Sequence, residues 1–264
     1  RNEETEKLVN HGIADIQPIA GGKELGHHNI HANAVGGFSR LNSELKVLRK
    51  YVFDHFFEYS SAPTLEEAMQ HFGISRKEAF SRFKGLEAEH HILLVPGTQR
   101  ILMANPYSAL TTPFLVRVGG KHYFANCAWD SVSMHVMLDM DAQVESYCHH
   151  CAEPIEISLS NGKVTSSSPT TPVIFLSMPV AKWYDNLVNT CSNNMVYFAS
   201  EGHMGEWLAG NPGLEGESLT VEKMAYVCRP LSMGRMNLEY ERPPKEELMA
   251  YWDSIGMKSG FWDF

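Results

Sequence analysis

The sequence predicts an α+β protein, with an N-terminal winged-helix-like helical region followed by a mixed, mostly antiparallel β-sheet core with flanking helices. Two observations predict this class. Between residues 42 and 89 apolar side chains recur with the period of an α-helix, and after Asn105 and Pro106 the period changes to two, which is typical of strands. With 264 residues, of which 44% are hydrophobic, the chain can bury such a core.

Three helices and a hairpin are predicted first. Asn42 or Ser43 caps a helix with an apolar stripe, Pro63 and Thr64 start a second helix that continues with Leu65, and Ser75 caps a third. Two apolar runs between residues 91 and 103 flank a turn and predict a hairpin. This order is that of a winged helix-turn-helix. Because acidic and basic residues balance in the third helix, we favour a structural or lid role over DNA binding.

The elements that follow alternate between strands and helices. From this pattern we divide the chain into a polar N-terminal extension (residues 1–40), a winged-helix-like domain (41–105), a core (106–230) and a C-terminal extension (231–264). Strands are expected at residues 114–118, 121–125, 143–147, 155–159, 163–166, 173–177 and 195–199, and helices at 127–138, 182–189, 201–209, 219–228 and 245–254.

Charge and cysteine content restrict the protein's class. A net charge of −9 argues against nucleic acid or an anionic membrane as the main partner. No apolar run approaches the roughly 20 residues that span a bilayer. Five cysteines without a regular framework fit a reducing compartment, so we expect a cytoplasmic protein whose thiols are kept for chemistry.

Cys127, Asp130 and Cys191 are the first candidate site. If Cys127 begins a helix, Asp130 falls on the same face, and the helix N-terminus should favour the Cys127 thiolate. Cys191, expected at the edge of a loop, is a second thiol that can converge on them. Two thiolates and a titratable acid suit a soft metal with proton delivery beside it. The alternative is that these cysteines only pack as small apolar residues.

Cys148 and Cys151 are the second candidate site, in a turn between two predicted strands. A single Cys-x-x-Cys supplies half of a tetrahedral structural zinc site, which His149, His150 or a distant thiol would have to complete. A redox disulfide is less favoured, because no thioredoxin-like βαβ pattern surrounds the pair. A packing role for both cysteines remains open.

Other candidate residues carry weaker signals. His27, His28 and His31 could ligate a metal, although scattered surface histidines are the commoner explanation. Cys228 lies on the apolar face of a predicted helix and is expected in the core. No glycine loop of the P-loop or dinucleotide-binding type occurs.

Four short motifs, in order along residues 42–228, resemble the organomercurial (alkylmercury) lyase family. They are YFANCAWD at residues 123–130, VESYC at 144–148, Cys191 followed by VYFAS at 196–200, and Trp207 followed by PGLEG at 212–216. The helical region that precedes them also has the family's order.

The resemblance implies an activity and a set of roles. Family members cleave a carbon–mercury bond by protonolysis and release a hydrocarbon and Hg(II), without an organic cofactor, in mercuric detoxification. By this resemblance Cys127 and Cys191 are the two catalytic cysteines, Asp130 shuttles the proton, and all three hold the mercury of substrate and product. Cys148 matches a structurally important cysteine. The implied partners are a small organomercurial and external thiols that take up the product, with a mercuric reductase as a further candidate.

This chain departs from the family pattern in three ways. It carries one more residue between Cys191 and Tyr197, it has Cys151 beside a histidine pair, and it is extended at both ends. We therefore keep three alternatives: a non-catalytic sensor or carrier of a soft metal (Hg, Cu or Zn), a lyase for another organometal, and a structural zinc protein. Asp130 separates a lyase from a carrier, because a carrier needs no proton donor.

Overall fold

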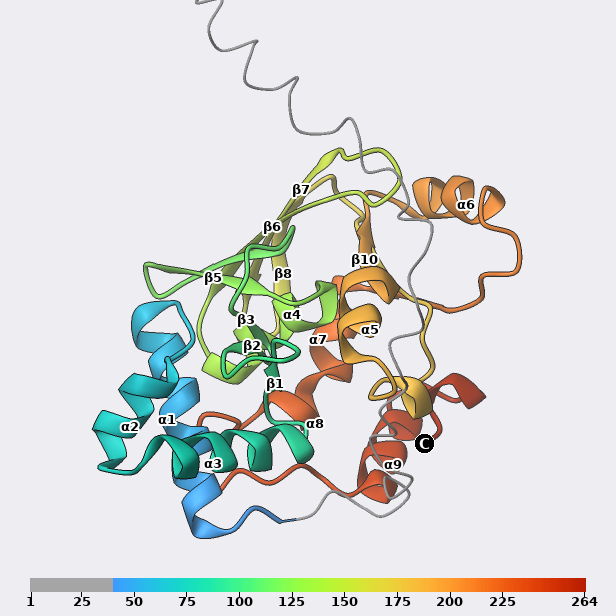
Figure 1. Cartoon of the computed structure of the whole chain (residues 1–264). Helices are drawn as coiled ribbons and strands as arrows, with labels where there is room; N and C mark the ends of the chain where they lie inside the picture. The colour runs from blue at the N-terminus through green and yellow to red at the C-terminus, as the bar shows by residue number, and fades with distance from the viewer. Residues whose placement is uncertain (1–39) are drawn as a thin grey trace, which may run out of the picture. The chain divides into compact units, whose positions relative to one another are not determined.

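The computed structural model describes residues 40–264, and its frame consists of two antiparallel sheets (Figure 1). The larger sheet has eight strands in the order β1-β2-β3-β5-β4-β6-β7-β8, and the smaller has the order β10-β9-β11. With helices packed around these sheets, the predicted α+β, mostly antiparallel fold is confirmed. Most of the predicted N-terminal extension, including His27, His28 and His31, lies outside the described residues.

The elements follow one another from the first described helix to the C-terminus. In chain order they are α1 (Ser43–Tyr59), α2 (Leu65–Phe72), α3 (Arg76–Ala88), β1 (Leu93–Leu94), β2 (Ile101–Ala104), β3 (Tyr107–Ser108), β4 (Leu115–Val118), β5 (Lys121–Ala125), α4 (Ala128–Leu138), β6 (Ala142–Tyr147), β7 (Pro154–Ser160), β8 (Lys163–Ser168), β9 (Val173–Leu176), the short 3-10 helix η1 (Val180–Lys182), α5 (Leu187–Asn194), β10 (Met195–Phe198), α6 (Glu201–Ala209), β11 (Glu217–Thr220), α7 (Val221–Val227), α8 (Arg229–Ser232), α9 (Lys245–Ser254) and η2 (Gly260–Trp262).

The first three helices begin where the sequence predicts, because polar side chains cap them. The Asn42 side chain accepts a hydrogen bond from the Leu45 N–H, and Thr64 and Glu67 form a reciprocal capping box before α2. The hairpin β1–β2 follows, but it continues through β3 into the large sheet. The assignment of this region as a winged-helix domain stays a prediction.

Helix α4 is the central element of the fold. It contacts β4, β5 and β6 of the large sheet as well as β10 of the small one, and residues 128–135 are all buried. Because β5 leads directly into α4, the first turn of α4 lies inside the protein between the two sheets. Cys127, the N-cap residue of α4, is therefore held in the core.

Two predicted helices have different bounds in the structure. The helix expected at residues 182–189 is replaced by η1 and the later helix α5, which begins after Asn186 because the Asn186 side chain caps it at the Asn189 N–H. The helix expected at 219–228 is preceded by β11, which pairs with β9, and only begins after the N-cap Thr220. Gly216 allows this pairing, since a Cβ there would lie 2.2 Å from the Leu176 carbonyl oxygen.

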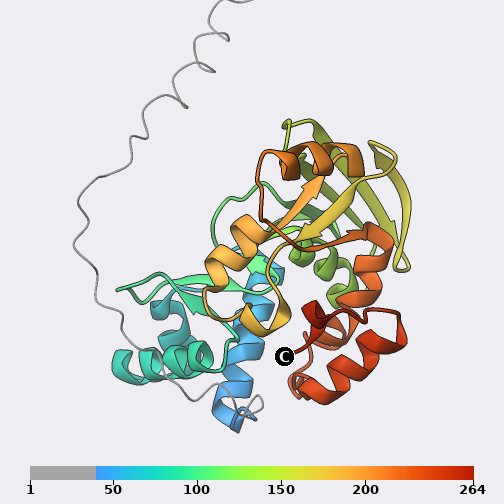
Figure 2. The ribbon, with the colours of Figure 1, turned by 90° about the vertical axis from the view of Figure 1, so that its right-hand side faces the viewer.

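The C-terminal segment packs against the rest of the chain, as Figure 2 shows in red beside α7 and α8. Trp252 on α9 is fully buried and donates a hydrogen bond to the Val227 carbonyl oxygen at 2.9 Å. Arg49 of α1 donates from its guanidinium to the carbonyl oxygens of Arg235 and Asn237. The described residues thus share one core, and the domain boundaries remain predictions. Among the described helices, none is both long and apolar enough to cross a membrane.

Candidate active site

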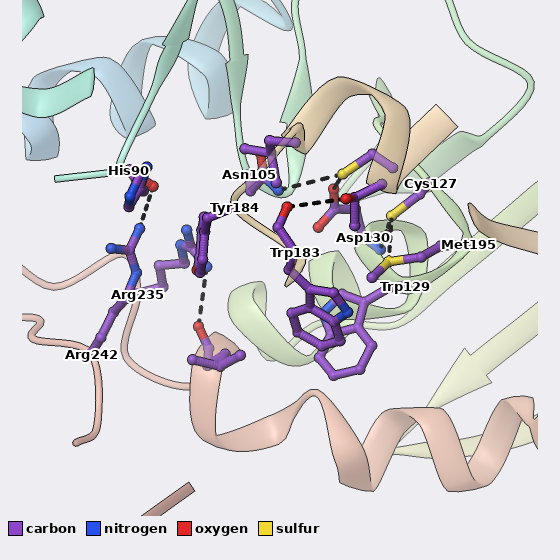
Figure 3. A pocket seen from close by; sticks show the side chains of 14 residues that line it. His90, Asn105, Cys127, Trp129, Asp130, Trp183, Tyr184, Met195, Arg235 and Arg242 are labelled. Carbon is purple, nitrogen blue, oxygen red and sulfur yellow. Dashed lines mark hydrogen bonds between the residues drawn. The ribbon is translucent and has the colours of Figure 1, made fainter. Parts of the chain in front are cut away.

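Cys127, Asp130 and Cys191 lie together in the interior of the protein. Each offers one ligand atom, and these three atoms all lie within 4.8 Å of one another. The Cys191 Sγ is 4.0 Å from Asp130 Oδ2, and the Asp130 N–H points to Cys127 Sγ at 3.4 Å (Figure 3). None of the three is more than 4% exposed, so any ion that they hold is shielded from water. The structure brings together the residues singled out by the sequence, while their catalytic roles stay a prediction.

The two cysteines come from different elements. Cys127 has an extended backbone and uses its Sγ as the cap of α4, which places Asp130 beside it. Cys191 lies inside α5 and is buried, so the expectation of a loop-edge position is wrong. The reason is that the cap at Asn186 starts α5 late and carries the helix through residue 194. The Cys191 thiol therefore has a fixed position on a helix.

Burial decides the protonation state of Cys127. Its removal from water raises the pKa of the Cys127 thiol, and the neighbouring Cys191 and Asp130 add to this. The N–H of Asp130 acts in the opposite direction but does not outweigh burial. The expectation that the helix N-terminus would favour the thiolate is therefore wrong for the metal-free protein. A soft cation has to displace the proton as it binds.

Asp130 is held ready for proton exchange. Burial raises its pKa to about 6, while the Asn126 amide, the positive charge of Arg235 and the Cys127 side chain act against this rise. The Asn126 amide donates to Asp130 Oδ2 at 3.1 Å and to the carbonyl oxygens of Pro106 and Tyr107 at 3.2 Å. Asn126 thus fixes the carboxyl group. Although Asn126 directly precedes Cys127, the sequence pattern gives no sign of this role.

A small cavity of about 50 Å³ adjoins the three residues. On one side Trp129 and Trp183 meet edge to face, with ring centroids 4.9 Å apart. Met195 Sδ lies 3.7 Å from Cys127 Sγ, and the Asn105 amide lies 3.9 Å from Cys191 Sγ. The sequence pattern gave no sign of these lining residues, which come from separate parts of the chain. They are, together with the site residues, His90, Asn105, Trp129, Trp183, Tyr184, Leu187, Thr190, Met195, Leu231, Arg235 and Arg242.

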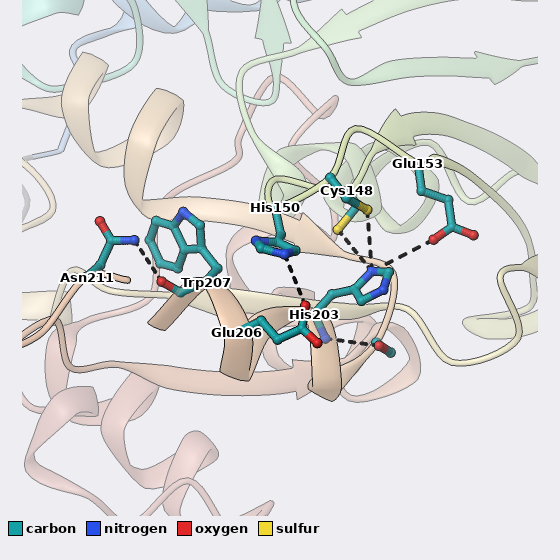
Figure 4. A network of polar contacts seen from close by, with 9 residues as sticks. Cys148, His150, Glu153, His203, Glu206, Trp207 and Asn211 are labelled. Carbon is teal, nitrogen blue, oxygen red and sulfur yellow. Dashed lines mark hydrogen bonds and ion pairs between the residues drawn. The ribbon is translucent and has the colours of Figure 1, made fainter. Parts of the chain in front are cut away.

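Cys148 and Cys151 form a second cluster with His203. The His203 Nδ1 lies 3.7 Å from Cys148 Sγ and 3.5 Å from Cys151 Sγ (Figure 4). Cys148 is buried, Cys151 is exposed, and His203 is intermediate. The sequence pattern gives no sign of His203 as a partner, because it lies more than 50 positions after the cysteines and reaches them from α6 through the fold.

The two histidines that were considered as partners of Cys148 and Cys151 do not join the cluster. His149 packs edge to face against Trp207, and His150 pairs with Glu206 at 3.1 Å. Cys228 is fully buried, as expected of a core residue. In the described part of the chain, the two clusters are the groups that could hold a metal ion.

Comparisons with known proteins agree with this geometry. Residues 107–232 match the family model of MerB, alkylmercury lyase. Alkylmercury lyases of Bacillus cereus and Clostridium butyricum are each 31% identical to this chain over 116 residues, which is 43% of this chain and 50% of theirs. The chain therefore spans about half the length of the curated relatives that it matches.

A solved structure agrees over a longer stretch. The mercury-bound form of MerB2 superposes with a TM-score of 0.57 at 26% identity, covering 70% of this chain and 88% of that one. The matched segment contains Cys127, Asp130 and Cys191, which this fold brings to one buried point. The chain is therefore similar to alkylmercury lyases over residues 107–232 and to MerB2 in its fold, at about 26–31% identity.

Proposed function

We propose that this protein cleaves the carbon–mercury bond of an organomercurial by protonolysis, giving a hydrocarbon and Hg(II). The observation that carries the proposal is the buried meeting of two thiols and one carboxyl group at Cys127, Cys191 and Asp130. Thiolates are the ligands that soft metals prefer, and a carboxyl group next to the metal can exchange a proton with the bound carbon. The similarity to alkylmercury lyases over residues 107–232 supports the same reaction.

In the first step one thiol captures R–Hg⁺ and loses its proton to solvent. Burial holds the Cys127 thiol in the protonated form, so its ionisation is driven by the metal–sulfur bond. The second thiol then binds the same mercury. Its proton passes to the Asp130 carboxylate, which lies 4.0 Å from Cys191 Sγ.

In the second step the carbon receives the proton. Two thiolates on mercury raise the electron density at the carbon, and the Asp130 carboxylic acid gives up its proton there. The electron pair of the carbon–mercury bond becomes the new carbon–hydrogen bond, so the hydrocarbon leaves and Hg(II) stays on both thiolates. Asp130 returns to the carboxylate. The step needs no external oxidant or reductant.

Product release and location follow from the same thiols. Hg(II) bound by two protein thiolates needs external thiols to leave, and a mercuric reductase is a natural consumer of the product. All five cysteines are free. Free thiols persist in a reducing compartment, so we place the reaction in the cytoplasm.

The test is release of methane from methylmercury in the presence of excess small thiol. We expect one methane per methylmercury consumed, and no methane from the Cys127→Ser variant. Cys151→Ser is the matched control, because Cys151 lies in the other cluster, and it should release methane as the wild type does. Binding of methylmercury without methane release would instead identify a soft-metal carrier.

A further inference from the structure

Helix α6 is weakly buried for an element so close to a sheet. None of its residues is fully buried, and its inner side consists of the half-buried Met204, Trp207 and Leu208. Its first turn, however, carries His203 to the turn between β6 and β7, where Cys148 lies (Figure 4). The contact between His203 and this turn therefore joins α6 to the large sheet.

The spacing of the three side chains is that of a tetrahedral metal site. Zinc–sulfur bonds of about 2.3 Å and a zinc–nitrogen bond of about 2.0–2.1 Å, at the tetrahedral angle, give a sulfur-to-nitrogen edge of about 3.5–3.6 Å. The His203 Nδ1 lies 3.5 Å from Cys151 Sγ and 3.7 Å from Cys148 Sγ. Both sulfur-to-nitrogen distances thus match those of a zinc site, and all three ligand atoms lie within 4.8 Å of one another.

The backbone of the turn surrounds the Cys148 sulfur with donors. Backbone N–H groups of Ala199, Cys151 and His150 point to it. The turn is closed by a hydrogen bond from the Ala152 N–H to the Cys148 carbonyl oxygen at 2.9 Å. Such a turn fixes the position of the Cys148 sulfur.

We propose that Cys148, Cys151 and His203 bind one zinc ion, which fastens α6 to the turn between β6 and β7. The Glu153 carboxylate lies 3.8 Å from His203 Nδ1, beside these three ligands. Zinc is the fitting ion because it accepts thiolate and imidazole together. The buried cluster of Cys127, Asp130 and Cys191 offers no imidazole, so the two clusters differ in the metal that they suit.

The test is the zinc content and zinc affinity of the purified protein, handled with a phosphine reductant. We expect one zinc ion per chain, retained in Cys127→Ser because that thiol belongs to the other cluster. His203→Ala should weaken zinc binding by more than about 100-fold, since even the outer partners of metal ligands change affinity by about 10–100-fold. Competition with a chromophoric chelator measures this change.

His150→Ala is the matched control, because His150 is next to the cluster but pairs with Glu206. It should keep the wild-type affinity for zinc. Equal zinc affinity of the His203→Ala and His150→Ala variants would overturn the proposal. So would a wild-type protein that takes up Hg(II) at this cluster but no zinc. Cys151 is exposed and His203 lies near the surface, so the variants Cys151→Ser and His203→Ala provide two independent routes to a folded test protein.

A second measurement follows the helix itself. Removing the zinc with a chelator should speed amide hydrogen exchange in α6 (Glu201–Ala209) and leave that of the buried α4 unchanged. Unchanged exchange in α6 would mean that the ion does not fasten the helix. Neither readout uses carbon–mercury cleavage, so failure here is distinct from failure of the proposed lyase activity.

Discussion

Asp130 combines two properties that rarely occur together, a carboxyl group that is almost fully buried and contact with two thiols. A buried carboxyl group favours its neutral form, and this is why its pKa rises to about 6. At neutral pH such a group can both accept and return a proton with little change in free energy. A carboxyl group with only a structural role in the first turn of α4 would not need this environment.

The Asp130→Asn variant separates the two roles. The Asn side chain can still accept the hydrogen bond from Asn126, and the backbone N–H of residue 130 can still point to Cys127, so we expect mercury capture by Cys127 and Cys191 to persist, as measured by thiol titration. Methane release should fall by about 10²–10⁴-fold, which is the usual worth of a positioned general acid. Asp139→Asn, at the other end of α4, is the matched control and should release methane normally. Wild-type turnover in Asp130→Asn would show that the proton comes from elsewhere.

The raised pKa of Asp130 also predicts how stability depends on pH in the metal-free protein. In the unfolded chain the pKa of Asp is about 3.9, so the folded state binds the proton more tightly. The resulting stabilisation is fully present below about pH 4 and is lost as the pH rises through about 6; it amounts to about 3 kcal/mol. Urea unfolding at several pH values should therefore show Asp130→Asn gaining stability relative to the wild type between pH 4 and 7. A difference in the free energy of unfolding between the two proteins that does not vary with pH would contradict this expectation.

At the scale of single residues, spacing alone predicted that Cys127 and Asp130 share one face of a helix. It did not predict the protonation state of Cys127, because burial depends on the two sheets that enclose α4. It also did not predict the role of Asn126. The Asn126 amide donates to Asp130 and to two backbone carbonyl oxygens about twenty residues earlier, and the spacing of residue types does not reveal these partners. Local sequence shows which groups are neighbours on a helix, whereas solvent exclusion is a property of the fold.

At the scale of elements, the position of Cys191 depends on where α5 begins. The Asn186 side chain accepts the Asn189 N–H at 3.1 Å and defines the first turn. We expect Asn186→Ala to cost about 0.5–2 kcal/mol, the usual cost of a lost N-cap. Because α5 carries Cys191, methane release should fall as well.

Asn42→Ala is the matched control for the cap of α5. Asn42 caps α1 in the same way, with the Leu45 N–H at 2.9 Å, so a similar loss of stability is expected on urea unfolding. Since α1 carries none of the three candidate catalytic residues, methane release should stay near that of the wild type. Equal activity losses in both variants would mean that α5 does not position Cys191.

Helices with clear local signals were predicted with their observed bounds, and elements defined by distant partners were not. Helices α6 and α9 begin and end where the sequence predicts. The strand β11 was read as part of a helix, since its identity depends on pairing with β9, some forty residues earlier. His203 was not predicted as a ligand for the same reason, because its distance from Cys148 and Cys151 depends on where α6 lies in the fold.

At the scale of the whole molecule, the C-terminal segment packs against a residue that lines the cavity of the candidate site. Trp252 is fully buried and its ring lies 6.3 Å from that of Trp183, which lines the cavity. We expect Trp252→Ala to destabilise the protein by about 3–5 kcal/mol, as measured by urea unfolding. Leu238→Ala is the control in the same segment; Leu238 is 39% exposed, so its loss should change stability by less than about 1 kcal/mol. Similar costs for both would indicate that the segment is not part of the core.

The fold class followed from the change of period after Asn105 and Pro106, but the assembly of the site did not. Arg235 and Arg242 line the cavity although they lie in the segment predicted as an extension, beyond the matched residues 107–232. Their approach requires the chain to return past α8 to α1, where Arg49 binds the carbonyl oxygens of Arg235 and Asn237. Periodicity contains no information on such long-range contacts.

Cys127 caps α4 and Cys191 lies in α5, two elements far apart in the chain, and this has a mechanical consequence for the product. A mercury ion held by both sulfurs ties two points about sixty residues apart in the chain, as a disulfide does, and by that analogy would stabilise the folded state by about 4 kcal/mol. The melting temperature should therefore rise while product remains bound and fall back when external thiol removes it. Each turnover would then leave the protein in a more stable, product-bound form. Removal of Hg(II) by the external thiol would limit the rate of the cycle.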